Sequence, residues 1–293
     1  MKFWTVITFL QVFEILKSEA WAPASSCYRP KKAFTLFSAL PTAPDISLNI
    51  LVSNGDEQSM SKAASFMVNS FWLGTGRLLI PVQDEQEVSV SDATRRILFD
   101  EQVFDLTAKY GERMGKRLLQ SCLLAAFDSE SGDILGMVGL ETSLLDKSKE
   151  DILSPELAES TLKNAVASLG PKQRRQYKDS SVKEIAQELL PPDLQLICCL
   201  SNLAVSPSAR RRGIAVKLCN EVERIASSEW EFDSLFLKVE SENCAARYLY
   251  EQKLGYKLKY TIESATAIRI DLGAGCFVES EASTIILAKA ITL

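Results

Sequence analysis

Hydrophobic side chains recur along this chain with two periods, one typical of strands and the other typical of helices. Residues 45–53 alternate apolar and polar side chains, which predicts a strand. Residues 57–72 and 92–119 place apolar side chains three or four positions apart, which predicts two amphipathic helices. On the second helix we expect one stripe to pack in the core, made of Phe99, Val103, Leu106, Tyr110 and Met114.

The rest of the chain continues this order of strands and helices. Two apolar runs, 123–127 and 134–141, flank a polar, glycine-containing turn, which is typical of a hairpin. Further elements are expected as strands at 196–205, 234–240, 256–262 and 284–290, and as helices at 214–227 and 243–253, the first of these helices turning Leu218, Cys219, Val222, Ile225 and Ala226 inward. The order predicts an α/β fold, with one domain built on a mixed, twisted sheet flanked by helices.

A polar segment, residues 145–193, interrupts the strand order between the hairpin and the strand at 196–205. It contains helical patterns near 154–169 and 181–190, bounded by prolines. We interpret it as a helical insertion that packs beside the sheet and covers a substrate entrance. Its basic residues favour a solvated face, with a docking patch for a partner as the alternative; they are Lys172, Arg174, Arg175 and Lys178.

The first 44 residues have the composition of a targeting presequence. Residues 1–20 join a short apolar run to small residues at Ser18 and Ala20, which is typical of a signal peptide. Residues 21–44 are basic, rich in Ser and Thr, and free of acidic side chains, as in organelle transit peptides. With Trp21 after the cleavage site, the arrangement resembles the bipartite presequence of algae with secondary plastids. We therefore expect a disordered presequence, plastid localisation and a folded domain over 45–293, with an ordinary secretory signal as the alternative.

Composition excludes several kinds of site. The chain contains no histidine, which removes the usual general base and every Ser/His or Cys/His catalytic arrangement. Seven cysteines without C-x-x-C spacing favour reduced thiols, and no metal site is predicted. The net charge is −5, and it is −8 outside the basic residues 1–44. An acidic body argues against nucleic-acid binding and suits cationic substrates. The short apolar leader predicts no membrane span after processing, and the sequence makes no prediction of oligomeric state.

A basic glycine loop separates the strand at 196–205 from the helix at 214–227. Its core is Arg210-Arg211-Arg212-Gly213-Ile214-Ala215. Free N–H groups and the positive end of the helix dipole make such a loop an anion site, and a glycine lets the backbone approach a phosphate closely. The alternative is a capped, solvated turn.

A second pair of residues lies about thirty positions farther on. Asn243 follows a strand and begins a helix, so it can cap that helix or hydrogen-bond an amide-bearing ligand. Tyr250 lies two helical turns beyond Asn243 on the same face, where a core aromatic is the alternative to a functional phenol. The loop, the Asn and the Tyr together predict a site for a phosphate-bearing ligand with a proton donor.

These motifs resemble the GNAT superfamily of acyl-CoA-dependent N-acyltransferases. The family pattern Arg/Gln-x-x-Gly-x-Gly/Ala is matched at 210–215, Asn-x-x-Ala-x-x-Leu-Tyr at 243–250, and a closing Gly-Tyr at 255–256. The resemblance implies transfer of an acetyl group from acetyl-CoA to a primary amine, with Tyr250 protonating the departing thiolate. It also implies a set of cofactor contacts at Leu203, Ala204, Val205, Arg210, Arg211, Arg212, Gly213, Ile214, Ala215, Asn243 and Ala246.

The resemblance leaves the general base open. Some relatives use a carboxylate on one of the two central strands, and the matching positions here are Cys199 and Lys238. Glu240 is our predicted base because it lies two residues from Lys238 and so on the same strand face. Glu141 and a chain of waters leading to backbone carbonyls are the competitors.

The residues 203–215 are similar to plant plastid acetyltransferases, which act on protein N-termini and lysine side chains. This similarity implies a protein or peptide amine as acceptor. A small amine such as a polyamine or an indoleamine is the first alternative. A non-catalytic acyl-CoA-binding module is the second, because the central strands lack the family's carboxylates.

Overall fold

The computed structural model describes residues 48–52, 55–74, 90–111, 118–271 and 273–291. The predicted presequence, 1–44, lies outside these residues, and its processing and disorder stay predictions. Within the described ranges, no helix is both long and apolar enough to cross a membrane.

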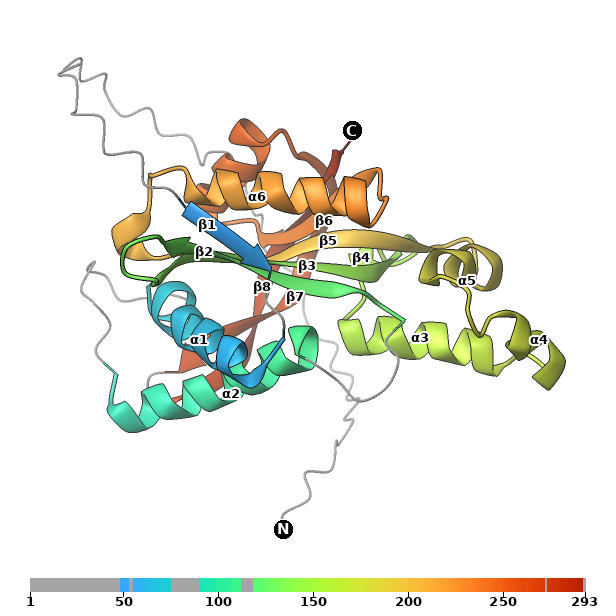
Figure 1. Cartoon of the computed structure of the whole chain (residues 1–293), viewed down its shortest axis with the longest axis horizontal. Helices are drawn as coiled ribbons and strands as arrows, with labels where there is room; N and C mark the ends of the chain where they lie inside the picture. Colours follow the sequence, from blue (N-terminus) through green and yellow to red (C-terminus); the bar gives the residue numbers. More distant parts are fainter. Residues whose placement is uncertain (1–47, 53–54, 75–89, 112–117, 272, 292–293) are drawn as a thin grey trace, which may run out of the picture. The chain divides into compact units, whose positions relative to one another are not determined.

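A mixed sheet forms the centre of the domain (Figure 1). Its strands follow the order β1-β2-β3-β5-β6-β8-β7, and β4 pairs only with β3. Among the described strands, β5 and β6 form the one parallel pair. The strands are β1 Leu48–Val52, β2 Ser121–Asp128, β3 Ile134–Asp146, β4 Asp151–Ile152, β5 Leu194–Val205, β6 Ser234–Glu240, β7 Lys257–Asp271 and β8 Cys276–Ala290. The predicted single α/β domain with a mixed sheet flanked by helices is therefore confirmed.

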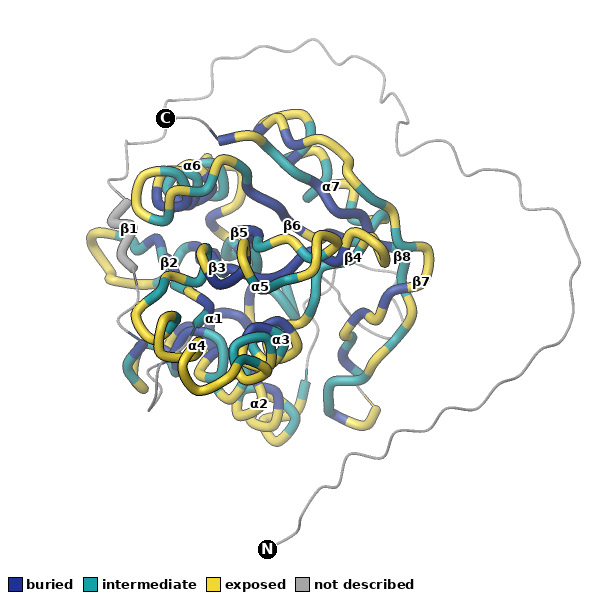
Figure 2. Tube along the Cα trace, turned by 90° about the vertical axis from the view of Figure 1, so that its right-hand side faces the viewer, coloured by how far each residue is buried: buried dark blue, intermediate teal, exposed yellow. Residues whose placement is uncertain are grey.

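Helices cover both faces of the sheet, with α6 on one side and α1 and α2 on the other (Figure 1). The helical elements are α1 Glu57–Met67, η1 Val68–Trp72, α2 Asp92–Tyr110, α3 Pro155–Ala167, α4 Pro171–Gln176, α5 Val182–Leu189, η2 Pro207–Ala209, α6 Ile214–Arg224, η3 Ile225–Glu229, α7 Cys244–Arg247 and η4 Tyr248–Lys253. Buried residues gather along the central strands and on the inward sides of the helices (Figure 2). The domain is thus a sheet between two helical layers.

Side-chain caps begin most of these helices. Asp56 accepts a hydrogen bond from the backbone N–H of Ser59 at 2.7 Å and so starts α1. Ser91 and Ser154 do the same for α2 and α3. Ser181 and Glu184 form a reciprocal capping box at the start of α5. Each cap satisfies an N–H group that the helix itself leaves without a partner. By contrast, no side chain caps α6, and its uncapped start is part of the candidate site.

The inward stripe predicted for α6 is confirmed. Ile214, Leu218, Cys219 and Val222 are buried, and the stripe continues through Ile225 and Ala226 in η3. It packs on apolar side chains of the central strands, which are Leu124, Val138, Leu140, Cys198, Leu200, Leu235 and Leu237. Full burial of one such side chain contributes about 1.5–3 kcal/mol, so this layer holds α6 and the loop before it firmly on the sheet.

The second helix is shorter than the sequence predicts. It ends at Tyr110 rather than near Leu119, because Gly111 leaves the helix with extended backbone angles of φ −72° and ψ 163°. Glycine favours such an exit since it stabilises a helix poorly. Leu119 packs instead against α3 and α5. Tyr110, the last helical residue, stays buried as predicted, whereas Met114 lies outside the described residues.

The hairpin β7–β8 is longer than predicted. Its far half pairs Ala265–Asp271 with Cys276–Ala282, beyond a register shift between Ile262 and Ala265. There Ile270 and Phe277 pack on Leu98 and the end of η1 rather than on the sheet core. Many side chains of this half face solvent, so its apolar alternation is too weak to be seen in the sequence.

The segment 145–193 contains the two predicted helical pieces, α3 and α5, together with the short α4. Leu162 and Ile185 pack them against Leu144 and Leu196, near the ends of β3 and β5. The basic residues of and after α4 are exposed, in accord with a solvated face. The segment begins later than predicted, because β3 continues to Asp146. Its role over a substrate entrance stays a prediction.

Candidate functional site

The central strands β5 and β6 separate before they end. Their parallel ladder pairs only 198–200 with 235–237. Beyond Leu200, β5 continues for five residues along β3 without pairing to β6. The two strands thus diverge, and backbone groups that a sheet would use between them face an opening.

A bulge produces this divergence. Met137 pairs with Ala204 but Gly139 pairs with Ser201, so two β5 residues, Asn202 and Leu203, oppose one residue of β3. Asn202 has φ 52°, a left-handed conformation that Asn tolerates better than most residues. A bulge bends its strand and increases the local twist, which turns the last residues of β5 away from β6.

The bulge determines which backbone groups line the opening. The N–H of Ser206 donates to the carbonyl of Leu135 at 3.0 Å, so Ser206 and Ala204 direct their backbone toward β3. By alternation, Val205 and Leu203 direct theirs toward the opening. Two of the three predicted strand contacts, Leu203 and Val205, therefore turn their backbone away from β3, and their contact with a cofactor stays a prediction. Ala204 belongs to the ladder with β3, and its side chain is buried.

The predicted anion cradle opens α6. Gly213 is its N-cap with φ 79°, and no side chain caps the helix. The first helical hydrogen bond there runs from the N–H of Lys217 to the carbonyl of Gly213 at 3.0 Å. The N–H groups of Ile214, Ala215 and Val216 consequently have no partner within the helix. Open space lies above Gly213, since a Cβ there would meet nothing within 4 Å.

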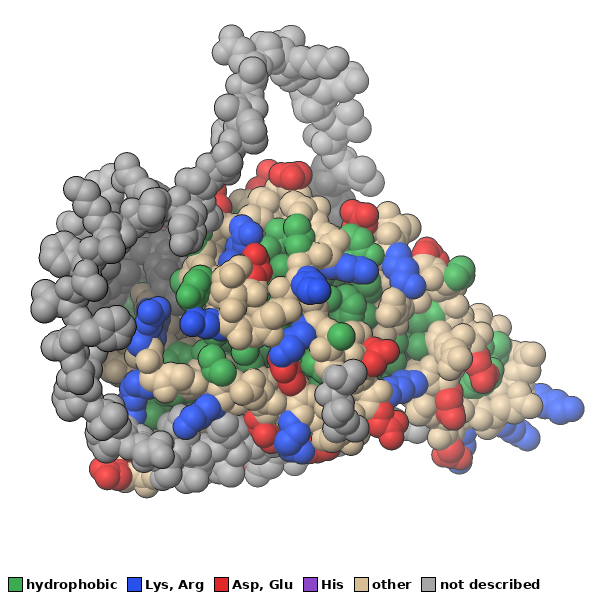
Figure 3. All heavy atoms as spheres, turned by 90° about the horizontal axis from the view of Figure 1, so that it is seen from above, with side chains coloured by type: hydrophobic (Ala, Val, Ile, Leu, Met, Phe, Trp, Pro, Cys, Tyr) green, Lys and Arg blue, Asp and Glu red, His purple; other side chains and the backbone are tan. Residues whose placement is uncertain are grey.

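The three loop arginines have different surroundings. Arg210 donates to three backbone carbonyls, those of Val205 at 3.3 Å, Ser70 at 3.4 Å and Gly74 at 3.0 Å. These hydrogen bonds hold the loop against the end of η1, a contact that the sequence did not predict. Arg211 and Arg212 are exposed. Basic side chains stand near the end of the face at which α6 begins (Figure 3).

Asn243 caps α7. Its side-chain oxygen accepts a hydrogen bond from the N–H of Ala246 at 3.1 Å. The alternative weighed for this residue, an N-cap, is therefore present in the structure. The cap uses only the oxygen, and the amide nitrogen of Asn243 keeps its two donors for a ligand. Ala246 is half-buried and packs against the α6 core.

Tyr250 lies in the core at the predicted helix position. The helix changes there to π-helical hydrogen bonding, a feature frequent at functional sites. The ring is buried and meets Tyr256 edge-on, with centroids 5.8 Å apart. Packing in the α6 cluster accounts for the ring, and the phenol's role as proton donor stays a prediction.

The positions at which relatives carry a carboxylate do not supply a base. Burial raises the pKa of the Cys199 thiol well above its ordinary value, so the thiol stays protonated. Lys238 forms an ion pair with Asp151 at 2.8 Å. Glu240, the predicted base, accepts two hydrogen bonds from Arg269 at 2.8 and 2.9 Å. This two-point pairing occupies both of its carboxylate oxygens, and nothing in the geometry supports Glu240 as a base.

A polar cluster beside the bulge was not predicted as a site. The Tyr110 hydroxyl lies 2.9 Å from the Ser201 hydroxyl and accepts a hydrogen bond from Asn202 Nδ2 at 2.9 Å. Glu141 lies on the same sheet face as Ser201, one diagonal step across the β3–β5 ladder, because Glu141 pairs with Cys199 and Gly139 pairs with Ser201. A Cβ on Gly139 would stand only 2.1 Å from the Tyr110 hydroxyl. The glycine within a strand was the available signal, because such a glycine often marks close approach of another group.

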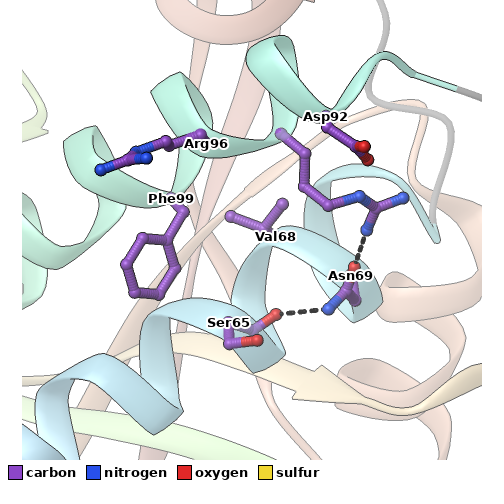
Figure 4. Close-up of a pocket in the computed structure, with 7 residues that line it drawn as sticks. Ser65, Val68, Asn69, Asp92, Arg96 and Phe99 are labelled. Carbon is purple, nitrogen blue, oxygen red and sulfur yellow. Dashed lines mark hydrogen bonds between the residues drawn. The ribbon is translucent and has the colours of Figure 1, made fainter.

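A cavity of about 270 Å³ lies between α1, η1 and α2. Asn69 bridges the two helices there, accepting from Arg95 and donating to the carbonyl of Ser65 at 2.9 Å (Figure 4). None of the predicted site residues lines it. In the part of the chain that the structure describes, no group of three His, Cys, Asp or Glu residues could hold a metal ion.

Comparison with known proteins places the site segment in a family model. The model of the acetyltransferase (GNAT) family matches residues 189–256, which contain β5, the loop, α6, β6 and α7. No curated protein matches the chain.

Several solved structures are similar over most of the domain. Arabidopsis thaliana NAA60 in complex with a bisubstrate analogue has 15% identity and a TM-score of 0.41, over 83% of this chain and 100% of that one. The ribosomal-protein-S18-alanine N-acetyltransferase from Escherichia coli has 12% identity and a TM-score of 0.41, over 84% and 96%. An N-acetyltransferase from Staphylococcus aureus Mu50 has 13% identity and a TM-score of 0.37, over 83% and 99%.

Proposed function

We propose that this chain is a GNAT family enzyme that transfers the acetyl group of acetyl-CoA to a primary amine. One observation carries the proposal: β5 and β6 pair only over 198–200 and 235–237, and the chain then runs from the end of β5 to an uncapped helix N-terminus. The opening offers backbone groups for an extended amide-bearing arm, and the helix offers N–H groups for a pyrophosphate. The family match over residues 189–256 covers both parts.

Each part of the site has a separate task in the proposed reaction. Backbone groups of Leu203 and Val205 hold the pantetheine arm in the opening, and the N–H groups after Gly213 hold the pyrophosphate. Arg211 and Arg212 add charge at the rim, and the Asn243 amide contacts the arm. Holding thioester and amine together makes the attack effectively unimolecular. A backbone N–H near Leu203 stabilises the oxyanion that forms.

Tyr250 supplies the proton for the leaving group. The amine nitrogen forms its bond to the thioester carbon, the carbon–sulfur bond breaks, and the departing thiolate takes the phenolic proton of Tyr250. Solvent restores that proton. This role rests on the motif 243–250, which ends at Tyr250.

We propose a protein or peptide amine, an N-terminus or a lysine, as the acceptor. The net charge of −8 outside residues 1–44 attracts a cationic acceptor. A polyamine or indoleamine would be attracted in the same way and is the first alternative. The binding-only alternative is favoured by Cys199 and Lys238, neither of which supplies a base, and is opposed by the retained Tyr250.

We also propose that the enzyme acts in a plastid, in keeping with the likeness to plant plastid protein acetyltransferases. The basis is the composition of residues 1–44. A fusion of these residues to a fluorescent protein should accumulate in the plastid of an alga with a secondary plastid. Accumulation in the secretory pathway instead would support the ordinary signal.

Acetyl transfer is tested with labelled acetyl-CoA and three acceptor sets: peptides with free N-termini, N-terminally blocked peptides containing lysine, and polyamines and indoleamines. We expect label on one of the peptide sets. Label on the small amines alone would establish the first alternative. Tight acetyl-CoA binding without transfer to any set would establish the binding-only alternative.

A further inference from the structure

The polar cluster beside the bulge places a hydroxyl group next to a carboxylate. Glu141 pairs with Cys199 and Gly139 pairs with Ser201, so Glu141 and Ser201 are diagonal neighbours on one face of the β3–β5 pair, within reach of a long side chain. A carboxylate can only accept, so a hydrogen bond between them runs from Ser201 to Glu141. The Nδ2 of Asn202 donates to the Tyr110 hydroxyl, and the Tyr110 and Ser201 hydroxyls lie 2.9 Å apart. When Ser201 donates to Glu141, Tyr110 donates to Ser201. The chain therefore runs Asn202, Tyr110, Ser201, Glu141. One lone pair of the Ser201 hydroxyl remains available to accept from a further donor.

The chain ends where the reaction would take place. Ser201 is the first residue of β5 beyond Leu200, at which the ladder with β6 stops. Glu141 lies opposite Cys199 across the β3–β5 ladder, and cross-strand partners share a face of the sheet. The position at which relatives carry a carboxylate is Cys199. Here the neighbouring strand provides a carboxylate on the same face.

We propose that Glu141 is the terminal proton acceptor of the acetyl transfer and receives the proton of the acceptor ammonium through the Ser201 hydroxyl. The proposal rests on the proposed function. Ser201 accepts a proton from the ammonium while its own proton passes to Glu141, which leaves a neutral amine and a protonated carboxyl group. The amine then attacks the thioester carbon. Glu141 and the product nitrogen each release one proton to solvent, and the CoA thiolate takes the proton of Tyr250.

Tyr110 and Asn202 are positioning residues in this scheme. Tyr110 holds the Ser201 hydroxyl so that its proton points at Glu141, and Asn202 holds Tyr110. Burial, followed by the charge of Glu141, raises the pKa of Tyr110 well above its ordinary value, so the phenol stays a donor at neutral pH. Glycine at position 139 makes room for this arrangement.

The environment of Glu141 strengthens it as a base. Burial raises the pKa of this carboxyl group above its ordinary value, and a carboxylate with a raised pKa holds an abstracted proton better. Other groups that act on Glu141 come from α2 and α3: Lys109 lowers its pKa, whereas Asp105 and Glu156 raise it. Facing it from β5 are Ser201 and the protonated thiol of Cys199.

The test compares the Glu141→Gln variant with the wild type and with a Glu130→Gln control, which makes the same chemical change at an exposed residue of the β2–β3 turn. The measurements are the pH dependence of kcat/KM for the amine and the Kd of acetyl-CoA. We expect Glu141→Gln to lower kcat/KM by about 10²–10⁴-fold at neutral pH, to remove the acidic limb of the profile, and to leave the Kd unchanged. The control should keep the wild-type limb.

An unchanged kcat/KM and an unchanged acidic limb in Glu141→Gln would overturn the assignment of Glu141, while the proposed function would stand on the active wild type. Absence of amine-dependent turnover in the wild type would overturn the proposed function and this assignment with it. If Glu141→Gln does not fold, the Glu141→Asp and Ser201→Ala variants test the proposal instead. The Asp variant should retain the limb and Ser201→Ala should lose at least about tenfold in kcat/KM; a wild-type rate in Ser201→Ala would also overturn the proposal.

Discussion

Gly139 and Tyr110 share a space that could not hold two side chains. The Tyr110 hydroxyl occupies the position at which a Cβ of residue 139 would project, and Ser201 lies 2.7 Å from that same point. Tyr110, which was predicted only as part of an apolar stripe, thus also has a hydroxyl group that contacts Ser201 and Asn202 beside the bulge. At the scale of single residues, the proposed function depends on the size of individual side chains and on which of them carry a proton.

Replacing Gly139 with Ala should destabilise the protein by about 1–3 kcal/mol, because the added methyl group overpacks the cluster around Tyr110. Urea unfolding measures the change. Gly170→Ala is the matched control, since its Cβ would stand 3.7 Å from the nearest atom, Gln173 Oε1. The control should stay within about 1 kcal/mol of the wild type. Equal effects at both positions would contradict the close contact.

Glu141→Gln should make the folded protein more stable at neutral pH while it slows the reaction. The folded-state pKa of Glu141 is raised by burial, so the protonated form is favoured in the folded protein. Its ionisation therefore costs stability as the pH rises from the unfolded-state pKa through the folded-state pKa. Glutamine resembles the neutral form.

The stability difference between the Gln variant and the wild type should be near zero in acid and should grow as the pH rises through this window. Thermal unfolding from about pH 4 to about pH 8 measures it. A variant that is less stable than the wild type at neutral pH would show that the Glu141 carboxylate stabilises the fold.

At the scale of elements, features encoded in consecutive residues could be predicted, whereas features set by contacts between distant segments could not. The α6 stripe, the hairpin β2–β3 and the loop at 210–215 are each encoded in consecutive residues, and each was confirmed in position. The far half of β7–β8 and the early end of α2 were not predicted. Both depend on packing between segments distant in the sequence, which periodicity cannot report.

The same distinction applies to the candidate site. Backbone recognition at the opening of α6 follows from a glycine and a helix start, so it could be seen in the sequence. The bulge at Asn202 and the pairing of Glu240 with Arg269 come from register between strands. Glu240, the predicted base, lies on the predicted strand, but its partner Arg269 could not be found from the sequence.

Exposed charges at the rim of the α6 cradle should strengthen acetyl-CoA binding. Replacing Arg211 and Arg212 together with Gln should raise the Kd of acetyl-CoA about tenfold at low salt, and the difference should shrink as salt screens the charges. Isothermal titration calorimetry measures both values. The double replacement of Lys172 and Arg175 with Gln on α4 removes the same charge and should leave the Kd unchanged. Equal losses in both variants would indicate a general effect of net charge.

At the scale of the whole molecule, the acidic domain contains several buried thiols. None of the described cysteines forms a disulfide. Burial raises the pKa of Cys122 and of Cys219 to about 12, and it raises that of Cys198 and Cys199 as well. Their thiols are therefore inert and act as small apolar side chains.

A brief exposure of the native protein to iodoacetamide should modify exposed Cys244 well before Cys198, Cys199 and Cys219. Peptide mapping by mass spectrometry gives the order. In denaturant the differences should disappear, because they come from burial. Rapid labelling of Cys199 in the native protein would contradict the packed core beneath the site.

The central claim is that the strand opening and the α6 cradle hold acetyl-CoA for direct transfer to an amine, with Tyr250 as the acid. The most direct measurement is amine-dependent release of CoA by the wild type and by Tyr250→Phe. We predict release by the wild type, a kcat lowered about 10²–10⁴-fold in the variant, and the same acetyl-CoA Kd in both proteins. No release above background from the wild type, or equal rates in the two proteins, would contradict this account.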